Sequence, residues 1–488
     1  MNNSKGEEMT YQAKVRQNSF PEGKEIFSWI KDLAQWGHRK TGTPEGRKSA
    51  EYIEGKMRAF GLEDVRIESV PSMCMMVEDF SLTVGGEKMD AFYINGTNRG
   101  GESGRFSFGT DGSESEFVYV GQGLAEDFER LDVKGKVVVA SVYLPEFDMQ
   151  KQHEWFDDPF VYDPLNQMEE KKKKVDIYSP SIWPANFYLA QNHGAVGFVG
   201  ILENYMDDPY FYNEDYTENG WPYGCQYMSL PALWVSRSSG KKIKAEFETS
   251  GVIRGQMTVD TLYEYRNAFN VSGRLKGKSD DIVLVHSHHD AVFEGAVQDA
   301  SGTSEMLALA KYFAQIPAEE REKTLMFAAL DTHYTDYAAN IGFVKKRKEV
   351  GDNVIIDIAI EHIGKEAAFD ENYNLYETGQ VEPRLFYVSE PKLYAFTKAT
   401  IANYDLKKSI AALVPVGKGL EREYKFHQDE VISDAFYWNE SGVPVVSMVC
   451  GMQYLFHNSD KPDRIPVEEL QPVGMAFAEI TTEAMRKL

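Results

Sequence analysis

Short apolar runs, separated by polar or glycine-rich segments, dominate the second half of the chain. Four of them lie at residues 282–285, 323–330, 354–360 and 443–449. Apolar runs without polar alternation are typical of strands buried on both faces of a mostly parallel sheet. Apolar residues at helical spacing follow the first run, between residues 303 and 313. The pattern predicts an α/β fold in which helices flank a mostly parallel central sheet.

The pattern changes between residues 86 and 255. Short strand-like runs alternate there with glycine turns, as at residues 117–120 and 134–140. The segments on either side, 1–85 and 256–488, have the helix and strand pattern of an α/β domain. We therefore expect one α/β domain formed by residues 1–85 and 256–488, with a β-rich domain, residues 86–255, inserted into it.

Two segments of the inserted region have an unusual composition. Residues 204–227 contain eight aromatic side chains among acidic ones. Such a segment either packs on itself as a loop or forms a wall that recognises substrate over an active site. The lysine run at residues 171–174 is interpreted as a solvated helix end or loop.

Composition and charge limit the partners that we expect. A net charge of −24 argues against nucleic acid and against an anionic membrane, since both require a basic face. The three cysteines are scattered and form no CxxC pair, which fits a reducing compartment. The first residues contain no apolar signal sequence, and no stretch approaches the roughly 18 apolar residues of a membrane span. We therefore expect a cytoplasmic protein.

Residues that bind metals or move protons lie where the four apolar runs end. They are His288, Asp290, Asp299, His333, Glu361 and His457. Alternation along the first strand puts His288 and Asp290 on one side, so one can bind a metal while the other supports its imidazole. The carboxyl ends of parallel strands meet at one edge of an open sheet, where ligands bind. We expect a metal site at this edge, although a polar strand end and a helix cap at Asp299 are the simpler alternatives.

The chain resembles the dinuclear zinc exopeptidases of the bacterial aminopeptidase and glutamate carboxypeptidase type, with an inserted protease-associated domain. The resemblance covers most of the chain. It rests on Thr41-Gly42-Thr43-Pro44, Val118-Tyr119-Val120-Gly121, Gly135-Lys136-Val137, Leu230-Pro231-Ala232, His288-x-Asp290, Asp299-Ala300-Ser301-Gly302, Ser433-Asp434 and Gly442-Val443-Pro444.

The resemblance implies a role for each of the metal-binding candidates. His288 would bind the first metal ion, with Asp290 supporting its imidazole, and Asp299 would bridge two ions. Glu361 stands where the family places an aspartate ligand, and His457 matches the last ligand. The resemblance thus implies zinc as the cofactor.

One position departs from the family pattern. The family has two adjacent glutamates after the second strand, a general base and a metal ligand, where this chain has His333 and Tyr334. Histidine suits either task, so His333 is expected to bind a second metal or to take the proton from water. A phenol is a poor base and an unusual zinc ligand, so Tyr334 is expected to act as an acid that stabilises the oxyanion. Whether the site binds one ion or two, and whether the metal is zinc or another divalent ion, stays open.

Together these features predict a metal-dependent hydrolase, an aminopeptidase-like metallopeptidase that cleaves an amide or peptide bond with a metal-activated water. A small molecule or short peptide would be the substrate. The alternatives are a non-peptide hydrolase or lyase on the same scaffold, and a binding protein that has kept the fold without turnover. Assembly into a homo-oligomer is left open.

Overall fold

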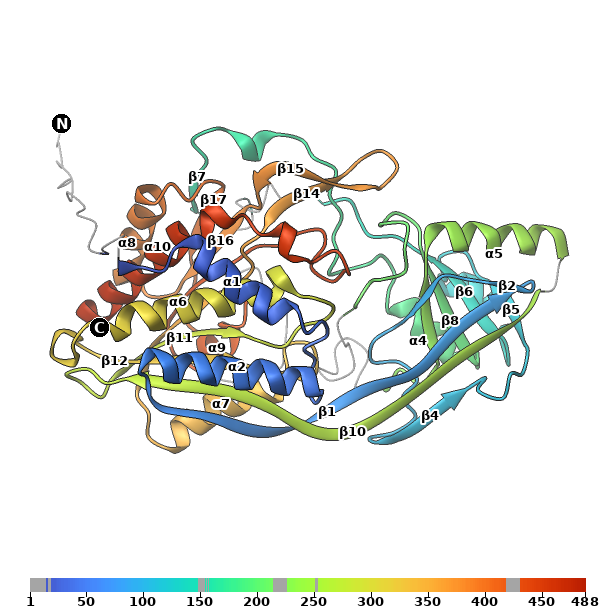
Figure 1. Cartoon of the computed structure of the whole chain (residues 1–488). Helices are drawn as coiled ribbons and strands as arrows, with labels where there is room; N and C mark the ends of the chain where they lie inside the picture. Colours follow the sequence, from blue (N-terminus) through green and yellow to red (C-terminus); the bar gives the residue numbers. More distant parts are fainter. Residues whose placement is uncertain are drawn as a thin grey trace.

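The computed structural model describes residues 15, 19–147, 154, 156, 158–213, 226–250, 253–417 and 431–488. Within them, a sheet of 16 strands runs through the molecule (Figure 1). Its centre consists of β12 (Thr324–Leu330), β11 (Ile282–His288), β13 (Val354–Ile360) and β18 (Val445–Val449), which are neighbours in this order and parallel. The predicted α/β fold with a mostly parallel central sheet is confirmed.

Further strands extend the sheet on both sides of this centre. On one side lie β16 (Arg384–Val388), β17 (Ser409–Leu413) and β7 (Phe160–Tyr162). On the other side β10 (Ile253–Leu275) pairs antiparallel with β12. A separate hairpin is formed by β14 (Lys365–Phe369) and β15 (Leu375–Val381).

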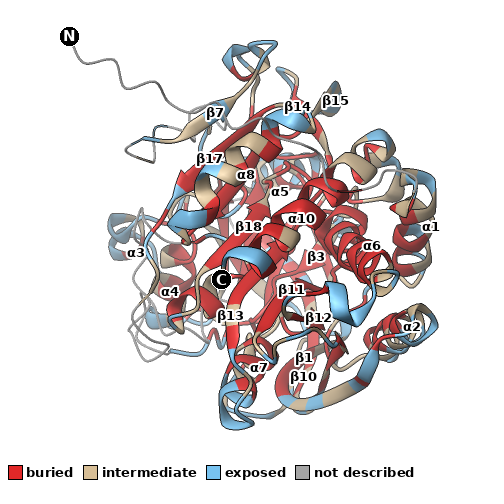
Figure 2. Cartoon of the chain, turned by 90° about the vertical axis from the view of Figure 1, so that its left-hand side faces the viewer, coloured by how far each residue is buried: buried red, intermediate tan, exposed pale blue. Residues whose placement is uncertain are grey.

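Helices cover both faces of the central strands, so their side chains are buried on both sides. Val283 and Val285 belong to the same apolar cluster as residues of α1 (Gly23–Ala34), α2 (Pro44–Phe60), α6 (Gly302–Ala314) and α10 (Val467–Lys487). The alternate residues Ile282 and Leu284 pack with Phe343 of α7 (Ala338–Glu349) and Trp438 of α9 (Phe436–Glu440). Figure 2 shows this buried centre surrounded by helices whose outer surfaces are exposed. The unbroken apolar run at residues 282–285 of β11 is the consequence of this two-sided burial.

Two long antiparallel strands connect this part of the molecule to the rest of the inserted region. The strand β1 (Glu63–Val84) pairs with β10 from Glu63 opposite Arg274 to Val84 opposite Gly255. At their far end lie β3 (Ala91–Tyr93), β5 (Ser115–Tyr119), β6 (Val137–Val142), β8 (Gly197–Leu202) and β9 (Ala232–Val235), with α4 (Ala185–Asn192) and α5 (Arg237–Ser250) (Figure 1). The remaining elements are β2 (Glu87–Lys88), β4 (Gly104–Phe108), α3 (Ala125–Arg130) and α8 (Pro391–Asn403). The division into domains at residues 86 and 255 stays a prediction.

The interpretation of the lysine run as solvated was wrong. Lys174 is buried, and its Nζ lies 3.1 Å from Oε1 of Glu366 on β14. Lys172 lies 3.0 Å from the other oxygen of the same carboxylate, and Lys408 contacts it at 2.8 Å. Buried charges require partners of opposite sign, and these lysines follow that rule. The run therefore fastens residues 172–174 to the β14 hairpin instead of facing water.

Another buried ionisable group, the carboxyl group of Glu305, has no such partner among the described residues. Glu305 on α6 is buried, and neither carboxylate oxygen has a hydrogen-bond partner among the described residues. Gly474 of α10 packs so close that a methyl group there would lie 2.3 Å from the Glu305 carboxylate. Burial raises the pKa of Glu305 well above its usual value. Since the unfolded chain ionises more readily, this group destabilises the fold increasingly as the pH rises above the unfolded pKa.

We expect Glu305→Met to raise the melting temperature, because it removes a buried carboxyl group without hydrogen bonds at nearly unchanged volume. An unpartnered buried polar group costs about 1–3 kcal/mol. Calorimetry at pH 4 and pH 7.5 should show the larger gain at pH 7.5, where the unfolded chain gains most from ionising Glu305. Exposed Glu319 provides the control, since Glu319→Met should change little. A lower melting temperature for Glu305→Met at pH 7.5 would contradict this account.

Candidate metal centre

The ends of the central strands bring together two groups of side chains that could hold a metal ion. One group consists of His288 at the end of β11 with Glu361 and His362 just after β13. The other consists of His288, His333 after β12, and Asp434 just before α9. Within each group, one potential ligand atom per residue lies within 4.8 Å of the others. The predicted meeting of strand ends at one edge therefore involves His288, Glu361 and His333.

Hydrogen bonds fix how the imidazoles of His288 and His362 are protonated. Nδ1 of His288 lies 3.0 Å from the backbone oxygen of Asp290 and 3.3 Å from its carboxylate. Nδ1 of His362 lies 2.7 Å from the backbone oxygen of Cys450. A carbonyl oxygen only accepts, so each Nδ1 carries a proton, and in the neutral imidazole each Nε2 then keeps a lone pair. Both Nε2 atoms are buried and have no hydrogen-bond partner in the described part of the chain.

Glu361 adds a carboxylate to these two nitrogens. Its Oε1 accepts a hydrogen bond of 2.9 Å from the backbone nitrogen of Asp434. Burial, together with the charges of Asp434 and Asp299, raises the pKa of Glu361 well above its usual range. A nearby cation would offset this effect and keep the carboxylate ionised. Two imidazole nitrogens with open lone pairs beside one carboxylate form a donor set that zinc uses in catalytic sites, so the residues fit the ion.

His333 stacks on His288 but has different neighbours. The two ring centroids lie 4.0 Å apart with an interplanar angle of 7°. Nδ1 of His333 lies 2.8 Å from Asp434, and Nε2 lies 3.2 Å from the amide nitrogen of Gln298. Burial alone would lower the pKa of His333, but the charge of Asp434 and the hydrogen bond to it outweigh burial and raise the pKa to about 10. Both ring nitrogens of His333 thus already have polar neighbours.

The oxygens of Asp299 are occupied by hydrogen bonds, and the residue belongs to neither group. Oδ2 accepts from the Ser287 hydroxyl at 2.5 Å. Oδ1 accepts from the backbone nitrogens of Gly302 and His362, both at 3.1 Å. Burial raises the pKa of Asp299 to about 6. The bridging role stays a prediction, whereas the observed contacts show Asp299 holding the start of α6 and the backbone of His362.

His457 also lies outside both groups. Its Nε2 lies 2.6 Å from the carboxylate of Asp208, and its Nδ1 lies 2.6 Å from the Ser459 hydroxyl. The ring packs edge-on against Tyr205, with centroids 5.7 Å apart. The imidazole of His457 therefore connects the loop after β18 to the inserted region. Its assignment as a metal ligand stays a prediction.

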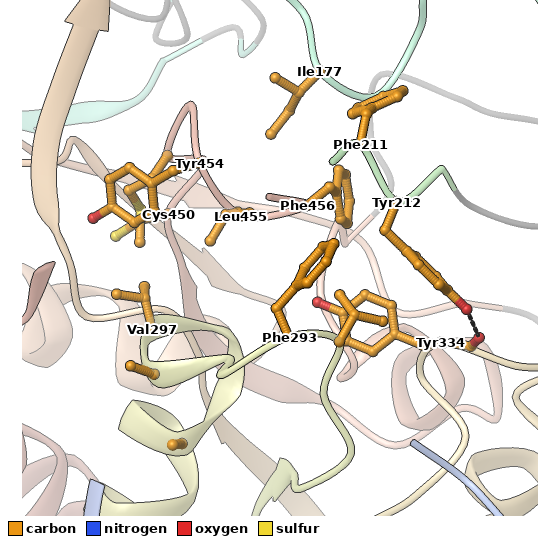
Figure 3. Close-up of a cluster of buried hydrophobic side chains, with 14 of the residues drawn as sticks. Ile177, Phe211, Tyr212, Phe293, Val297, Tyr334, Cys450, Tyr454, Leu455 and Phe456 are labelled. Carbon is orange, nitrogen blue, oxygen red and sulfur yellow. Dashed lines mark hydrogen bonds between the residues drawn. The ribbon is translucent and has the colours of Figure 1, made fainter. Parts of the chain in front are cut away.

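Tyr334 lies beside the two stacked imidazoles with its hydroxyl buried. The ring is edge-on to His288, with centroids 6.0 Å apart, and the hydroxyl has no hydrogen-bond partner among the described residues. Its backbone nitrogen donates to the Asp290 carboxylate at 3.0 Å. Figure 3 shows Tyr212 approaching from the inserted region, where its hydroxyl donates to the backbone oxygen of Tyr334 at 3.4 Å. Asp290 therefore supports both His288 and Tyr334.

The first part of the aromatic segment packs against this centre. Phe211 forms an isolated bridge with His457, and Tyr212 packs edge-on against Tyr334 with centroids 5.6 Å apart. Tyr216, Trp221 and Tyr223 lie outside the described residues. Tyr212 therefore reaches the site, whereas Tyr205 and Phe211 pack on each other with centroids 5.5 Å apart, so both hypotheses for the segment stay open.

Sequence reasoning did not identify three residues of the centre. His362 directly follows Glu361 at the same strand end, so a second histidine there was an available signal. Asp434 occurs in a segment of family resemblance but precedes a helix, where a carboxylate is ordinarily a cap. Nothing in the local sequence distinguishes Gln298, whose position next to His333 depends on the loop before α6.

We expect His362→Ala to lose zinc and His457→Ala to retain it. Loss of a residue that merely supports a ligand costs about 10–100-fold in metal affinity, so loss of a ligand should cost at least as much. Competition titration with a chromogenic chelator measures the affinity of each variant. The reverse result, with zinc lost from His457→Ala alone, would favour the ligand set implied by the family resemblance.

Comparison with known proteins supports this picture. The family model described as Peptidase family M28 matches residues 270–332. The matched segment ends immediately before His333. Aminopeptidase YwaD of Bacillus subtilis (strain 168) is 22% identical over 272 residues, which cover 53% of this chain and 52% of that protein. The aligned part thus spans about half the length of this relative.

Solved structures match the fold over nearly the whole chain. A zinc aminopeptidase from Bacillus subtilis has a TM-score of 0.63 at 18% identity, covering 95% of this chain and 96% of that one. A Peptidase M28 precursor from Shewanella amazonensis SB2B has a TM-score of 0.65 at 14% identity, covering 96% and 94%. The chain therefore resembles peptidase family M28 over residues 270–332 and has the fold of a zinc aminopeptidase and of a Peptidase M28 precursor, which confirms the predicted resemblance.

Proposed function

We propose that the protein is a zinc-dependent hydrolase that cleaves peptide or amide bonds of small substrates, as an aminopeptidase-like metallopeptidase. The observation that carries the proposal is the pair of buried imidazole nitrogens beside Glu361, on His288 and His362, that have no hydrogen-bond partner among the described residues. Relatives by sequence and by fold include an aminopeptidase and a zinc aminopeptidase.

We further propose a single ion, held by His288, His362 and Glu361. Zinc bound there would polarise the carbonyl of the substrate and lower the pKa of a bound water. The residues predicted for a second ion support it less well, because Asp299 and His457 already bind other groups in the protein. Binding of one ion also fits the loss of the family's glutamate pair.

His333 is suited to carry a proton within this site. Asp434 holds its Nδ1, and Nε2 faces Gln298 at the metal-binding edge. A carboxylate that orients an imidazole in this way is typical of general acid–base catalysis. We therefore favour proton transfer for His333 over the ligand role, because a ligand nitrogen must be free of other partners.

Tyr334 is suited to stabilise negative charge on the substrate. Its buried hydroxyl has no acceptor among the described residues, and its ring lies against both His288 and His333. An ordered donor in a buried site stabilises an oxyanion far more than it would in water. The hydroxyl would donate to the carbonyl oxygen as charge develops there.

The two alternative functions have less support. A non-peptide hydrolase or lyase, and a binding protein without turnover, both fit the scaffold, but the related proteins are peptidases. The inserted domain as a protease-associated domain, the cytoplasmic location and any homo-oligomer stay predictions. No helix among the described residues is long and apolar enough to span a bilayer.

Hydrolysis of L-alanine p-nitroanilide and L-alanyl-L-alanine amide by zinc-loaded protein tests the proposed function. Chelation and His288→Ala should both abolish turnover, and zinc should restore only the wild type. Tyr334→Phe should keep zinc and lower kcat by about 100-fold, the cost of losing one oxyanion donor. The control, Tyr394→Phe on α8, should have wild-type activity. Turnover that survives both chelation and His288→Ala would refute the metal mechanism.

A further inference from the structure

A small pocket of about 20 Å³ lies beside Tyr334, between the ends of the central strands and the inserted region. Its lining residues come from the loop before α2, from β1 and β10, and from the inserted region. They are Lys40, Thr41, Met73, Cys74, Met75, Asn95, Arg99, Tyr212, Tyr263, Tyr334 and Thr335. The pocket therefore shares Tyr334 with the candidate metal centre.

The charge of this lining is opposite to that of the whole protein. The chain has 76 acidic and 52 basic residues, yet the described residues that line the pocket include two basic side chains and no carboxylate. A concave site with one sign of charge raises the local concentration of oppositely charged ligands. The pocket is thus suited to an anion.

Lys40 is the group in the pocket best placed to bind that anion. Its Nζ lies 5.0 Å from the ring centroid of Tyr212 and 5.8 Å from that of Tyr93. No carboxylate in the described part of the chain forms an ion pair with it. Burial lowers the pKa of Lys40 to about 8, although interactions with Cys74 and Asp290 act to raise it. An incoming anion would supply the missing partner.

Neighbouring residues hold the backbone of Lys40 in place. Arg39 is buried and donates to the backbone oxygens of His289 at 3.2 Å and Glu294 at 2.6 Å. On the other side, the Thr41 hydroxyl donates to the Asp331 carboxylate at 2.6 Å. Both anchors belong to the strand ends that carry the metal centre. The backbone of Lys40 is therefore held in place relative to that centre before any substrate binds.

We infer that Lys40 binds a carboxylate of the substrate and so selects short peptides with a negative charge near the cleaved bond. The inference rests on the proposed function for its substrate class. A carboxylate fits better than a doubly charged phosphate, because the Arg99 guanidinium already donates to the backbone oxygens of Gly101 and Glu102. The Lys40 ammonium remains to donate hydrogen bonds to one carboxylate.

Binding of N-acetyl-L-alanine and of its uncharged amide to zinc-loaded, full-length protein tests the inference without turnover. Calorimetry should show the acid binding about tenfold more tightly, the effect of one hydrogen bond between charged groups. Lys40→Met should abolish this preference and Lys40→Arg should retain it. Equal affinity of the acid and the amide for the wild type would overturn the inference.

Lys398 on α8 provides a matched control. It also lies over two aromatic rings, with Nζ 4.5 Å from Tyr394 and 5.9 Å from Phe160. Lys398→Met should keep the full preference for the acid. An equal loss of preference in Lys398→Met and Lys40→Met would show a general effect of charge and overturn the assignment to Lys40.

Kinetics connect the pocket to catalysis and separate the two proposals. With L-alanyl-L-alanine, Lys40→Met should raise KM about tenfold and change kcat little, while L-alanyl-L-alanine amide should be unaffected. Binding of the acid through Lys40 without any hydrolysis would refute the proposed function and uphold the inference. Hydrolysis of L-alanyl-L-alanine with no change in KM for Lys40→Met would uphold the proposed function and overturn the inference. N-acetyl-L-aspartic acid α-amide, whose carboxylate is on the side chain, shows which carboxylate is recognised.

Discussion

The structure depends on the need to satisfy polar groups that the central strands bury at their carboxyl ends. His288, Glu361 and His362 are all buried, and the backbone carbonyls beneath the imidazoles hold their Nδ1 protons. This arrangement leaves two lone pairs with no donor among the described residues. Unpartnered buried polar atoms are costly, and the convergence of these two at one carboxylate fits a metal ion.

Several supporting residues connect this centre to the rest of the fold. Asp299 ties the start of α6 to the backbone of His362, and Asp290 ties β11 to Tyr334. Arg39 connects the loop before α2 to the end of β11. The proposed ligands and the pocket around Lys40 therefore share one rigid frame. Two carboxylates near the site, those of Asp299 and Asp290, thus hold neighbouring groups in position.

The sequence predicted the sheet well, because burial on both faces demands uninterrupted apolar runs. It also located the edge of the site through the polar residues that end those runs. The particular ligands were harder to predict. Whether Asp299 faces the site or caps α6 depends on the loop after Gly295, and whether His457 is free depends on Asp208, about 250 residues away in sequence. Burial of Lys174 likewise depends on partners on β14, which local composition does not reveal.

X-ray absorption spectroscopy of the zinc-loaded protein tests the central claim most directly. With one ion bound by His288, His362 and Glu361, the spectrum should show two imidazole nitrogens at about 2.0–2.1 Å and one carboxylate oxygen. It should contain no zinc–zinc scattering at about 3.5–4 Å, the separation in two-metal sites. A zinc–zinc vector at that distance, or a coordination shell unchanged by His362→Ala, would contradict the account.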